Sequence, residues 1–269
     1  MTSATEDRIH ATIATDIGAA PRQVAAAAAL LDGGATVPFV ARYRKEVTGG
    51  LDDTQLRRLS DRLSYLREME ARRETILGSI REQGKLTDAL ARAIAAADSK
   101  ATLEDIYLPF KPKRRTKAMI ARENGLGPLL QAILADRRAT PETLARAYLS
   151  DAVPTEKDAL TGARDILVET LAEDATLLGA LRRFMHEAAQ VTARVQPGKE
   201  EAGAKYADYF DHTEAWATIP SHRALAILRA AREEVLTVGI APDEAGAERA
   251  VAIIAAAVGT PGNGPGDAL

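Results

Sequence analysis

Apolar residues recur every three or four positions along most of the chain, which is the spacing of one face of a helix. Near the start, Ile9, Ile13 and Ile17 stand four apart and are followed by a glycine. A longer stripe of leucines and isoleucines runs from Leu56 to Ile80, and its polar positions carry charges of both signs. The sequence therefore predicts a long helix there, solvated on one side, within a chain that is helical almost throughout.

Residues that begin and end helices stand between these stripes. Pro21 suits a first helical turn. Side chains that can accept a backbone hydrogen bond stand at the other expected N-termini, namely Asp52 or Asp53, Thr87, Thr140, Thr155 and Ser221. Glycine pairs bound residues 35–50, which we predict to be irregular. The pattern also predicts two helical pieces hinged at 125–128, and a helix over 175–195 that Pro197 ends.

The chain changes character at residues 197–205, which we predict to be a linker. A short helix, the strand "VLTVGI" and a further helix follow, and the end of the chain is rich in glycine and proline. The predicted fold is all-α, a multi-helix assembly with a small α/β segment at the C-terminus. Its expected parts are a helical domain over 1–196, linker helices and the start of an α/β domain over 197–258, and a disordered tail over 259–269.

The composition is that of an ordinary folded protein, with 46% apolar and 27% charged residues among 269. The formal net charge of -3 gives no overall attraction to nucleic acid, so such binding requires local clusters of cations. The absence of cysteine excludes disulfides and cysteine-ligated zinc, and it favours a cytoplasmic location. No apolar run reaches spanning length and no signal peptide is recognisable, so we expect no membrane partner.

Motifs for catalysis or cofactor binding are missing. The four histidines are scattered, and there is no Walker loop, nucleophile elbow or dinucleotide fingerprint. One short stretch gathers Asp208, Asp211, His212 and Glu214, which could hold a cation weakly but are better explained as a polar turn. We predict that the protein is not an enzyme and has no cofactor, no metal site and no small-molecule substrate.

The clearest chemical signal is the basic stretch "YLPFKPKRRTKAMIAR". Its prolines favour an extended loop, and no acid occurs in it. The cations in the loop are Lys111, Lys113, Arg114, Arg115 and Lys117. Such a loop suits contact with a phosphate chain, while the common alternative is a solvated basic loop. The two rings in "YLPF" are better explained as core side chains than as platforms for base stacking.

A second group of cations lies in "VPFVARYRKEVTGGLDDTQLRRL", at Arg42, Arg44 and Lys45. In one interpretation these side chains share a basic face with residues 111–117 and also contact phosphates. In the other, the arginines pair with the acids that follow and clamp the loop against the long helix. Those acids are Glu46, Asp52 and Asp53. Their number favours the clamp, so the loop at 111–117 is the stronger prediction for nucleic acid.

Three blocks of the sequence carry a family resemblance. They are "GGATVPFVARYRKEVTGGLDDTQLR", "LEDIYLPFKPKRRTKAMIARENGLGPL" and "KYADYFDHTEAWATIPSHRALAIL". In order and spacing these blocks resemble the N-terminal region of the Tex family of bacterial transcription accessory proteins, from about residue 5 to about residue 240. One departure follows "SHRALA", where Arg229-Ala230 and Glu233-Glu234 replace the family's usual Arg-Gly and Glu-Gly.

The resemblance implies a helical fold with a helix-turn-helix-like portion and a long central helix. It also implies a cytoplasmic, nucleic-acid-binding scaffold linked to transcription, without established enzymatic chemistry. In the family an RNase-H-like domain, helix-hairpin-helix elements and an OB-fold RNA-binding domain come afterwards. The chain is therefore expected to be a truncated fragment.

Two functions follow as hypotheses. The first is sequence-nonspecific, non-catalytic binding of RNA or DNA through the basic loop, as the N-terminal module of a transcription accessory protein. The second is a protein-interaction scaffold, in which the long helix displays "LREMEARRE", including Arg72, Arg73 and Glu74, to the transcription machinery. In that case nucleic-acid binding resides in the C-terminal domains.

Overall fold

A computed structural model of the chain describes residues 3–259 and 264–268. It divides into two compact units, Met1–Phe110 and Lys111–Leu269. Both are mostly helical, and within the described residues one three-stranded sheet supplies the β-structure, which confirms the predicted fold class. The boundary that the sequence placed after residue 196 lies inside the second unit. Among the described residues, no helix combines the length and apolar character needed to cross a bilayer.

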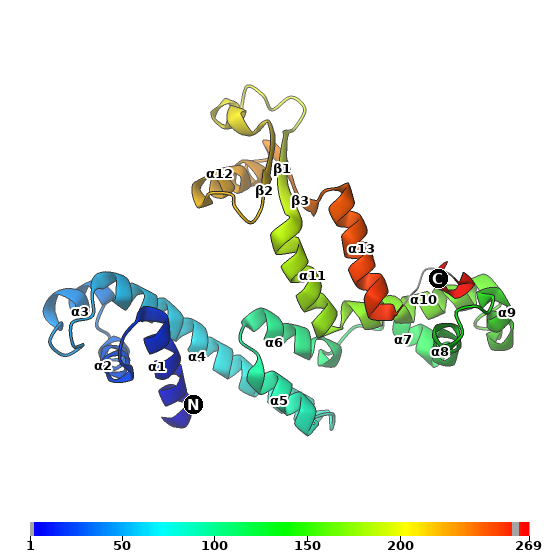
Figure 1. The fold of residues 1–269 in the computed structure, drawn as a ribbon, viewed down its shortest axis with the longest axis horizontal. Helices are drawn as coiled ribbons and strands as arrows, with labels where there is room; N and C mark the ends of the chain where they lie inside the picture. The colour runs from blue at the N-terminus through cyan, green and yellow to red at the C-terminus, as the bar shows by residue number, and fades with distance from the viewer. Residues whose placement is uncertain (1–2, 260–263, 269) are drawn as a thin grey trace. The chain divides into compact units, whose positions relative to one another are not determined.

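The first unit is built along the predicted long helix, α4 (Asp53–Glu82). Around its N-terminal half pack α1 (Ser3–Ile17), α2 (Pro21–Asp32) and α3 (Val37–Tyr43), as Figure 1 shows. The apolar stripe that predicted α4 forms this core, because Leu56, Leu59 and Leu63 are buried in one cluster with the isoleucines of α1. Helix α3 lies within residues 35–50, so the prediction that this whole segment is irregular was wrong.

The C-terminal half of α4 packs against α5 (Asp88–Ala96) and α6 (Lys100–Tyr107), and a short 3-10 turn, η1 (Leu108–Phe110), ends the unit. A second apolar cluster fills this half, and it includes Ile76 and Ile80 of α4. One helix thus supplies part of both cores of the first unit.

Several predicted helix caps are present. The Asp52 carboxylate accepts a hydrogen bond from Gln55 N at 2.7 Å, and Thr87 and Thr155 cap α5 and α10 (Glu156–Ala172) in the same way. Thr140 and Ser221 make no such side-chain bond. Their helices begin instead with Pro141 at the first turn and with Pro220 at the N-cap position.

The second unit begins with a group of helices around one core. These are α7 (Lys117–Glu123), α8 (Gly127–Ala135), α9 (Pro141–Ala145) and α10 (Glu156–Ala172), with a 3-10 turn, η2 (Arg146–Tyr148), after α9. Helices α7 and α8 join through the predicted hinge, where Gly125 has a φ of +78°. This helix–turn–helix pair packs on α10.

The rest of the second unit is an α/β arrangement. Helix α11 (Ala175–Ala188) runs directly into strand β1 (Ala189–Val195), which lies between β2 (Asp211–Ala215) and β3 (Leu236–Pro242). Both pairings are antiparallel, with Val191 opposite Glu214 on one side and Ile240 on the other. The helix predicted over 175–195 therefore ends early, whereas the predicted strand "VLTVGI" is confirmed as β3.

Two helices and two turns complete this arrangement. Helix α12 (Ser221–Arg232) and the turn η3 (Ala204–Tyr209) pack on the sheet, and α13 (Glu244–Val258) packs on α11. The turn η4 (Pro265–Ala268) contacts the segment that follows α8, because Asp267 pairs with Arg137 at 2.9 Å. Disorder predicted over 259–269 therefore does not describe residues 264–268. The remaining tail residues, 260–263 and 269, lie outside the described part of the chain.

Candidate nucleic-acid interface

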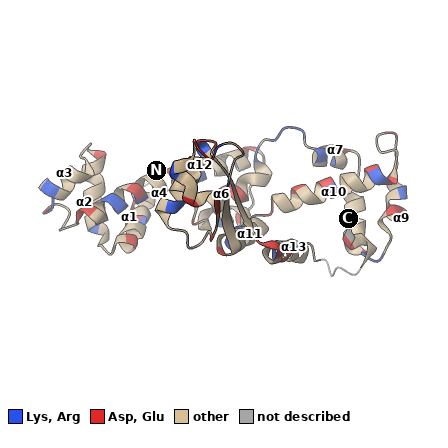
Figure 2. Cartoon of the chain, turned by 90° about the horizontal axis from the view of Figure 1, so that it is seen from above, with Lys and Arg blue, Asp and Glu red and all other residues tan. Residues whose placement is uncertain are grey.

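The basic loop, residues 111–117, leads into α7. In Figure 2 the blue of its Lys and Arg residues marks the loop before α7, and α10 carries red acidic segments. The fold brings carboxylates at the C-terminal end of α10 to this loop. Lys113 Nζ pairs with Glu173 and lies 4.0 Å from Glu169, and Thr116 donates a hydrogen bond to Glu169 at 2.7 Å. Arg115 pairs with Glu123 of α7. Part of the positive charge that the sequence placed here is therefore neutralised within the unit.

Glu169 is the centre of this arrangement. Its side chain is 14% exposed, and Arg122 of α7 also donates a hydrogen bond to it. Burial alone would raise the pKa of Glu169. The hydrogen bonds from Arg122 and Thr116, with the nearby charge of Lys113, outweigh burial and hold the pKa below its ordinary value. The carboxylate thus ties the loop and α7 to α10.

Two cations of the loop are exposed to solvent and, in the described part of the chain, are not neutralised by a carboxylate. Arg114 and Lys117 are exposed, and within the described residues neither has a carboxylate partner. The rings before the loop do not accompany them to the surface. Tyr107 is buried, its hydroxyl lies 3.0 Å from Ser79 Oγ, and Phe110 packs against the same core. The prediction that these rings are core side chains is confirmed.

The second group of cations follows a different pattern. Arg42 lies at the end of α3, and Arg44 and Lys45 follow it, all three exposed. Among the described residues none of them forms an ion pair. The Arg42 guanidinium lies 6.0 Å from the ring centre of Tyr43, and that of Arg44 lies 5.4 Å from the ring centre of Phe39. These contacts are cation–π in kind and leave the charges open to solvent.

The clamp that the sequence favoured for Arg42 and Arg44 is wrong. Asp52 caps α4, and Asp53 binds Arg57 one turn further along that helix, at 2.7 Å. Two of the three carboxylates expected to clamp the loop are thus used at the start of α4, and the third, Glu46, forms no ion pair among the described residues. The two predicted basic segments, 42–45 and 111–117, belong to different compact units.

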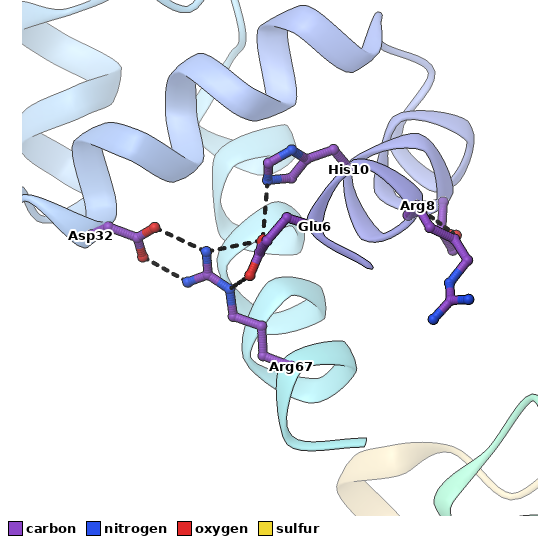
Figure 3. Close-up of polar contacts among 6 residues, drawn as sticks. Glu6, Arg8, His10, Asp32 and Arg67 are labelled. Carbon is purple, nitrogen blue, oxygen red and sulfur yellow. Dashed lines mark hydrogen bonds and ion pairs between the residues drawn. The ribbon is translucent and has the colours of Figure 1, made fainter. Parts of the chain in front are cut away.

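The charged segment of α4 predicted to meet a partner instead holds the first unit together. Arg67 forks between Glu6 of α1 and Asp32 of α2, with oxygens at 3.1 Å and 2.6 Å (Figure 3). His10 Nε2 lies 3.6 Å from Glu6 in the same group. Hydrogen bonds from Arg67 hold the pKa of Asp32 below its ordinary value, although burial opposes the shift.

The two arginines that follow are also engaged. Arg72 pairs with Glu104 of α6 at 2.6 Å, and Arg73 is buried. Of the three residues named for partner contact, Glu74 alone is exposed and has no interaction described in the structure. The mixed charges of this helix, which suggested contact with a partner, are therefore explained by contacts inside the unit.

The polar stretch at 208–214 contributes strand β2 rather than only a turn. Glu214 accepts a hydrogen bond from Arg223 of α12 at 2.6 Å and lies 3.2 Å from His212. These contacts lower the pKa of Glu214, with Arg223 as the main cause. Within the part of the chain that the structure describes, no three acidic or histidine side chains are placed to hold a metal ion.

Sequence reasoning missed two residues beside the second group of cations. Phe39 and Tyr43 are large aromatic side chains, yet they are 41% and 55% exposed. The available signal was their spacing. They stand four apart, one helical turn, so they share one face of α3, beside the fully buried Val40. Because the segment was predicted to be irregular, no helical face was assigned to it.

Comparison with known proteins places the chain in a family. The family model described as Tex-like protein N-terminal domain matches residues 7–81, and that described as Tex central region-like matches 136–268. Protein YhgF of Escherichia coli is 57% identical over 233 residues, and Transcriptional accessory protein Tex of Neisseria gonorrhoeae is 54% identical over 228 residues. The chain belongs to the Tex family, as its sequence predicts.

The coverage of these matches is unequal. They take in 86% and 85% of this chain but 30% of each bacterial relative, so the chain spans about a third of their length. S1 RNA-binding domain-containing protein 1 of Homo sapiens is 29% identical over 215 residues, 76% of this chain and 21% of that protein.

Proposed function

We propose that this chain is a non-catalytic nucleic-acid-binding module of a Tex-family transcription accessory protein, which contacts phosphates without reading base sequence. The observation that carries the proposal is a set of exposed cations without a carboxylate partner among the described residues. They are Arg42, Arg44 and Lys45 in the first unit, and Arg114 and Lys117 in the second. Phosphate oxygens are the acceptors that such cations bind in nucleic acids.

The eight predicted contact residues divide by their surroundings. Lys113 and Arg115 hold carboxylates of their own unit, so we assign them to positioning the loop. Lys111 remains a predicted contact. The names of two relatives support a role in transcription and in RNA binding, since one is a transcriptional accessory protein and another carries an S1 RNA-binding domain.

A salt titration tests the proposal. Fluorescence anisotropy would follow binding to labelled RNA and DNA, single- and double-stranded, at several salt concentrations. If five cations each neutralise one phosphate, the log–log salt slope for single strands is roughly -3.5, about -0.7 per contact. Reversal of the first group, in Arg42→Glu/Arg44→Glu/Lys45→Glu, is expected to reduce the slope by about 2. Arg114→Glu/Lys117→Glu should reduce it by about 1.4.

A charge-matched variant separates local contacts from net charge. Arg22, Lys85 and Arg92 are exposed in the same unit as the first group, and none forms an ion pair among the described residues. Reversal of these three residues changes the net charge by the same amount as the triple variant of the first group. It should leave the salt slope unchanged. Equal losses in this control and in the test variants would contradict the proposal. Cleavage of labelled RNA or DNA in the presence of Mg²⁺ or Mn²⁺ would contradict the non-catalytic part.

The alternative function, a scaffold for the transcription machinery, is favoured by one observation. Leu225 and Leu228 lie on one side of α12 and are 66% and 48% exposed. Such a pair suits an apolar contact with another protein. A pull-down of transcription proteins that Leu225→Asp/Leu228→Asp abolishes, with no effect on nucleic-acid binding, would support the scaffold.

A further inference from the structure

Helix α3 exposes two aromatic rings side by side. The ring centres of Phe39 and Tyr43 are 5.3 Å apart and their planes are inclined by 48°. Val40 of the same helix lies in the core, and Val37 and Ala41 pack against the same cluster. Aromatic residues are only 4% of this chain, so two neighbouring exposed rings are an unusual use of them. The rings contribute little to the core, and a large part of each side chain is exposed.

Positive charge lies at the same place. The guanidinium groups of Arg44 and Arg42 lie over the Phe39 and Tyr43 rings, and Lys45 follows directly. Between positions 37 and 51 there is one acid, Glu46, which is exposed and forms no ion pair among the described residues. A ligand that meets these rings therefore also meets cations and little negative charge.

Hydrogen bonds from α2 and within the segment hold the residues that follow α3 in one conformation. Gln23 of α2 donates hydrogen bonds from Nε2 to Thr48 O at 3.3 Å and to Gly49 O at 2.8 Å. Thr48 is fully buried, and its hydroxyl donates to Lys45 O at 3.2 Å. Gly49 has a φ of +64°, which glycine adopts without strain. Because the loop is already ordered, a ligand loses less free energy in ordering it.

We propose that this surface, formed by Phe39, Arg42, Tyr43, Arg44 and Lys45, is a binding site for single-stranded nucleic acid. An unpaired base stacks on Phe39 or Tyr43 while the cations contact the flanking phosphates. The inference rests on the proposed function and adds the ligand class. Rings beside cations are the combination that binds single strands, because every base has a flat face for stacking. In a duplex those faces are covered by neighbouring base pairs. RNA and DNA share this chemistry.

Leucine substitution separates stacking from apolar contact. In Phe39→Leu/Tyr43→Leu the apolar side chains remain but the rings are lost, whereas Tyr43→Phe keeps both rings. Val168→Ala, at a residue that is 58% exposed on α10, serves as the control for loss of an exposed apolar side chain. The probes are labelled oligo-uridine and oligo-thymidine single strands, RNA and DNA duplexes of the same length, and a strand that contains 2-aminopurine. Circular dichroism and thermal unfolding establish that each variant is folded.

We expect the leucine variant to lose roughly five- to a hundredfold in affinity for single strands, with the salt slope and the duplex affinity unchanged. The change in 2-aminopurine fluorescence on binding should disappear with it. Tyr43→Phe and Val168→Ala should bind single strands as the wild type does.

The contrary outcomes are separable. If the leucine variant binds single strands as tightly as the wild type, the stacking site is overturned and phosphate binding stands. Equal losses for single strands and duplexes would also overturn it. If a poly-glutamate peptide binds the wild type and the leucine variant alike and displaces the single strand, the surface serves an acidic protein. If the wild type binds neither single strands nor duplexes, the proposed function itself fails.

Discussion

At the residue scale, Arg73 shows how a charged side chain stabilises the first unit from inside. Its Nε and Nη2 donate hydrogen bonds to Ile94 O and Ala97 O, at 3.0 Å and 2.9 Å, and Glu70 pairs with it. The two carbonyls lie at the C-terminal end of α5, where helix carbonyls lack internal partners and carry partial negative charge. The guanidinium therefore caps α5 from α4.

Replacement of Arg73 by Met should lower the free energy of unfolding by about 2–4 kcal/mol, because two buried carbonyls lose their donors. Urea unfolding followed by circular dichroism measures the change. Arg57→Ala removes an exposed pair on the same helix and should have a much smaller effect. Equal stabilities of the Arg73→Met variant and the wild type would show that water replaces the arginine.

Asp32 makes stability depend on pH in the acid range. Its folded-state pKa lies below 3.8, the ordinary value, mainly because of the hydrogen bonds from Arg67. The carboxylate therefore contributes stability that is complete above the unfolded pKa and is lost as pH falls through the folded pKa. We expect Asp32→Asn to cost below about 1 kcal/mol at pH 7, since the pair is partly exposed.

The difference between wild type and Asp32→Asn should vanish once the pH is below the folded pKa of Asp32. Unfolding curves of both proteins between neutral pH and about pH 2.5 measure it. A difference that stays constant over this range would mean that Arg67 does not lower the pKa of Asp32 in the folded protein.

Glu234 occupies a backbone position that suits glycine. Its φ is +56°, in the left-handed region, where a side chain costs roughly 1–2 kcal/mol. The sequence shows this position as a departure from the Tex pattern, where the usual residue is glycine. Glu234→Gly should raise the free energy of unfolding by roughly 0.5–1 kcal/mol, after the greater freedom of glycine in the unfolded chain is subtracted. Thermal unfolding tests the gain, and Glu234→Ala, which keeps a Cβ, should show none.

At the element scale, the sequence predicts what is decided locally. The apolar stripe of α4 begins a few residues after its cap, Asp52, so the helix and its start can be predicted together. Strand β1 cannot, because Val191 and Val195 stand four apart and continue the spacing of α11. Its conformation depends on β3, whose Ile240 pairs with Val191 from far along the chain.

Helix packing at Gly162 provides a test at the same scale. A Cβ at this position of α10 would lie 2.3 Å from Leu126 Cδ1 and 3.2 Å from Ala121 Cβ. Gly162→Val should therefore lower the free energy of unfolding by about 1–3 kcal/mol through overpacking. At Gly78, within α4, a Cβ would meet nothing within 4 Å, so Gly78→Ala should raise it by about 0.5–1 kcal/mol. Chemical unfolding of both variants measures the opposite signs, and a neutral Gly162→Val would show that Leu126 moves aside.

At the scale of the whole molecule, the candidate site was predicted only in part. The sequence identified the cations at 42–45 and 111–117 because basic residues cluster locally. It could not show that Glu169 and Glu173, distant in sequence, neutralise Lys113, or that Asp53 prefers Arg57 to the cations of the α3 segment. Which cations remain available is decided by contacts between elements, and such contacts are not readable from neighbouring residues.

The division into two units predicts where a protease first cuts. Each unit has its own hydrophobic clusters, and the chain passes from one to the other at residues 110–111. Arg114 is exposed there, without an ion pair among the described residues and outside any helix. In the predicted linker at 197–205, by contrast, Lys199 is half-buried and its carbonyl accepts a hydrogen bond from Gly203 N at 2.8 Å.

Limited trypsin digestion should therefore cut first near Arg114, because a protease needs an exposed and locally mobile stretch of backbone. The expected products are two fragments, one ending near residue 114 and the other beginning there. Mass spectrometry identifies the cut, and circular dichroism shows whether each fragment unfolds cooperatively on heating. Because each unit keeps its own cores, both fragments should remain folded. A first cut at Lys199, or rapid loss of one fragment, would instead favour the division after residue 196.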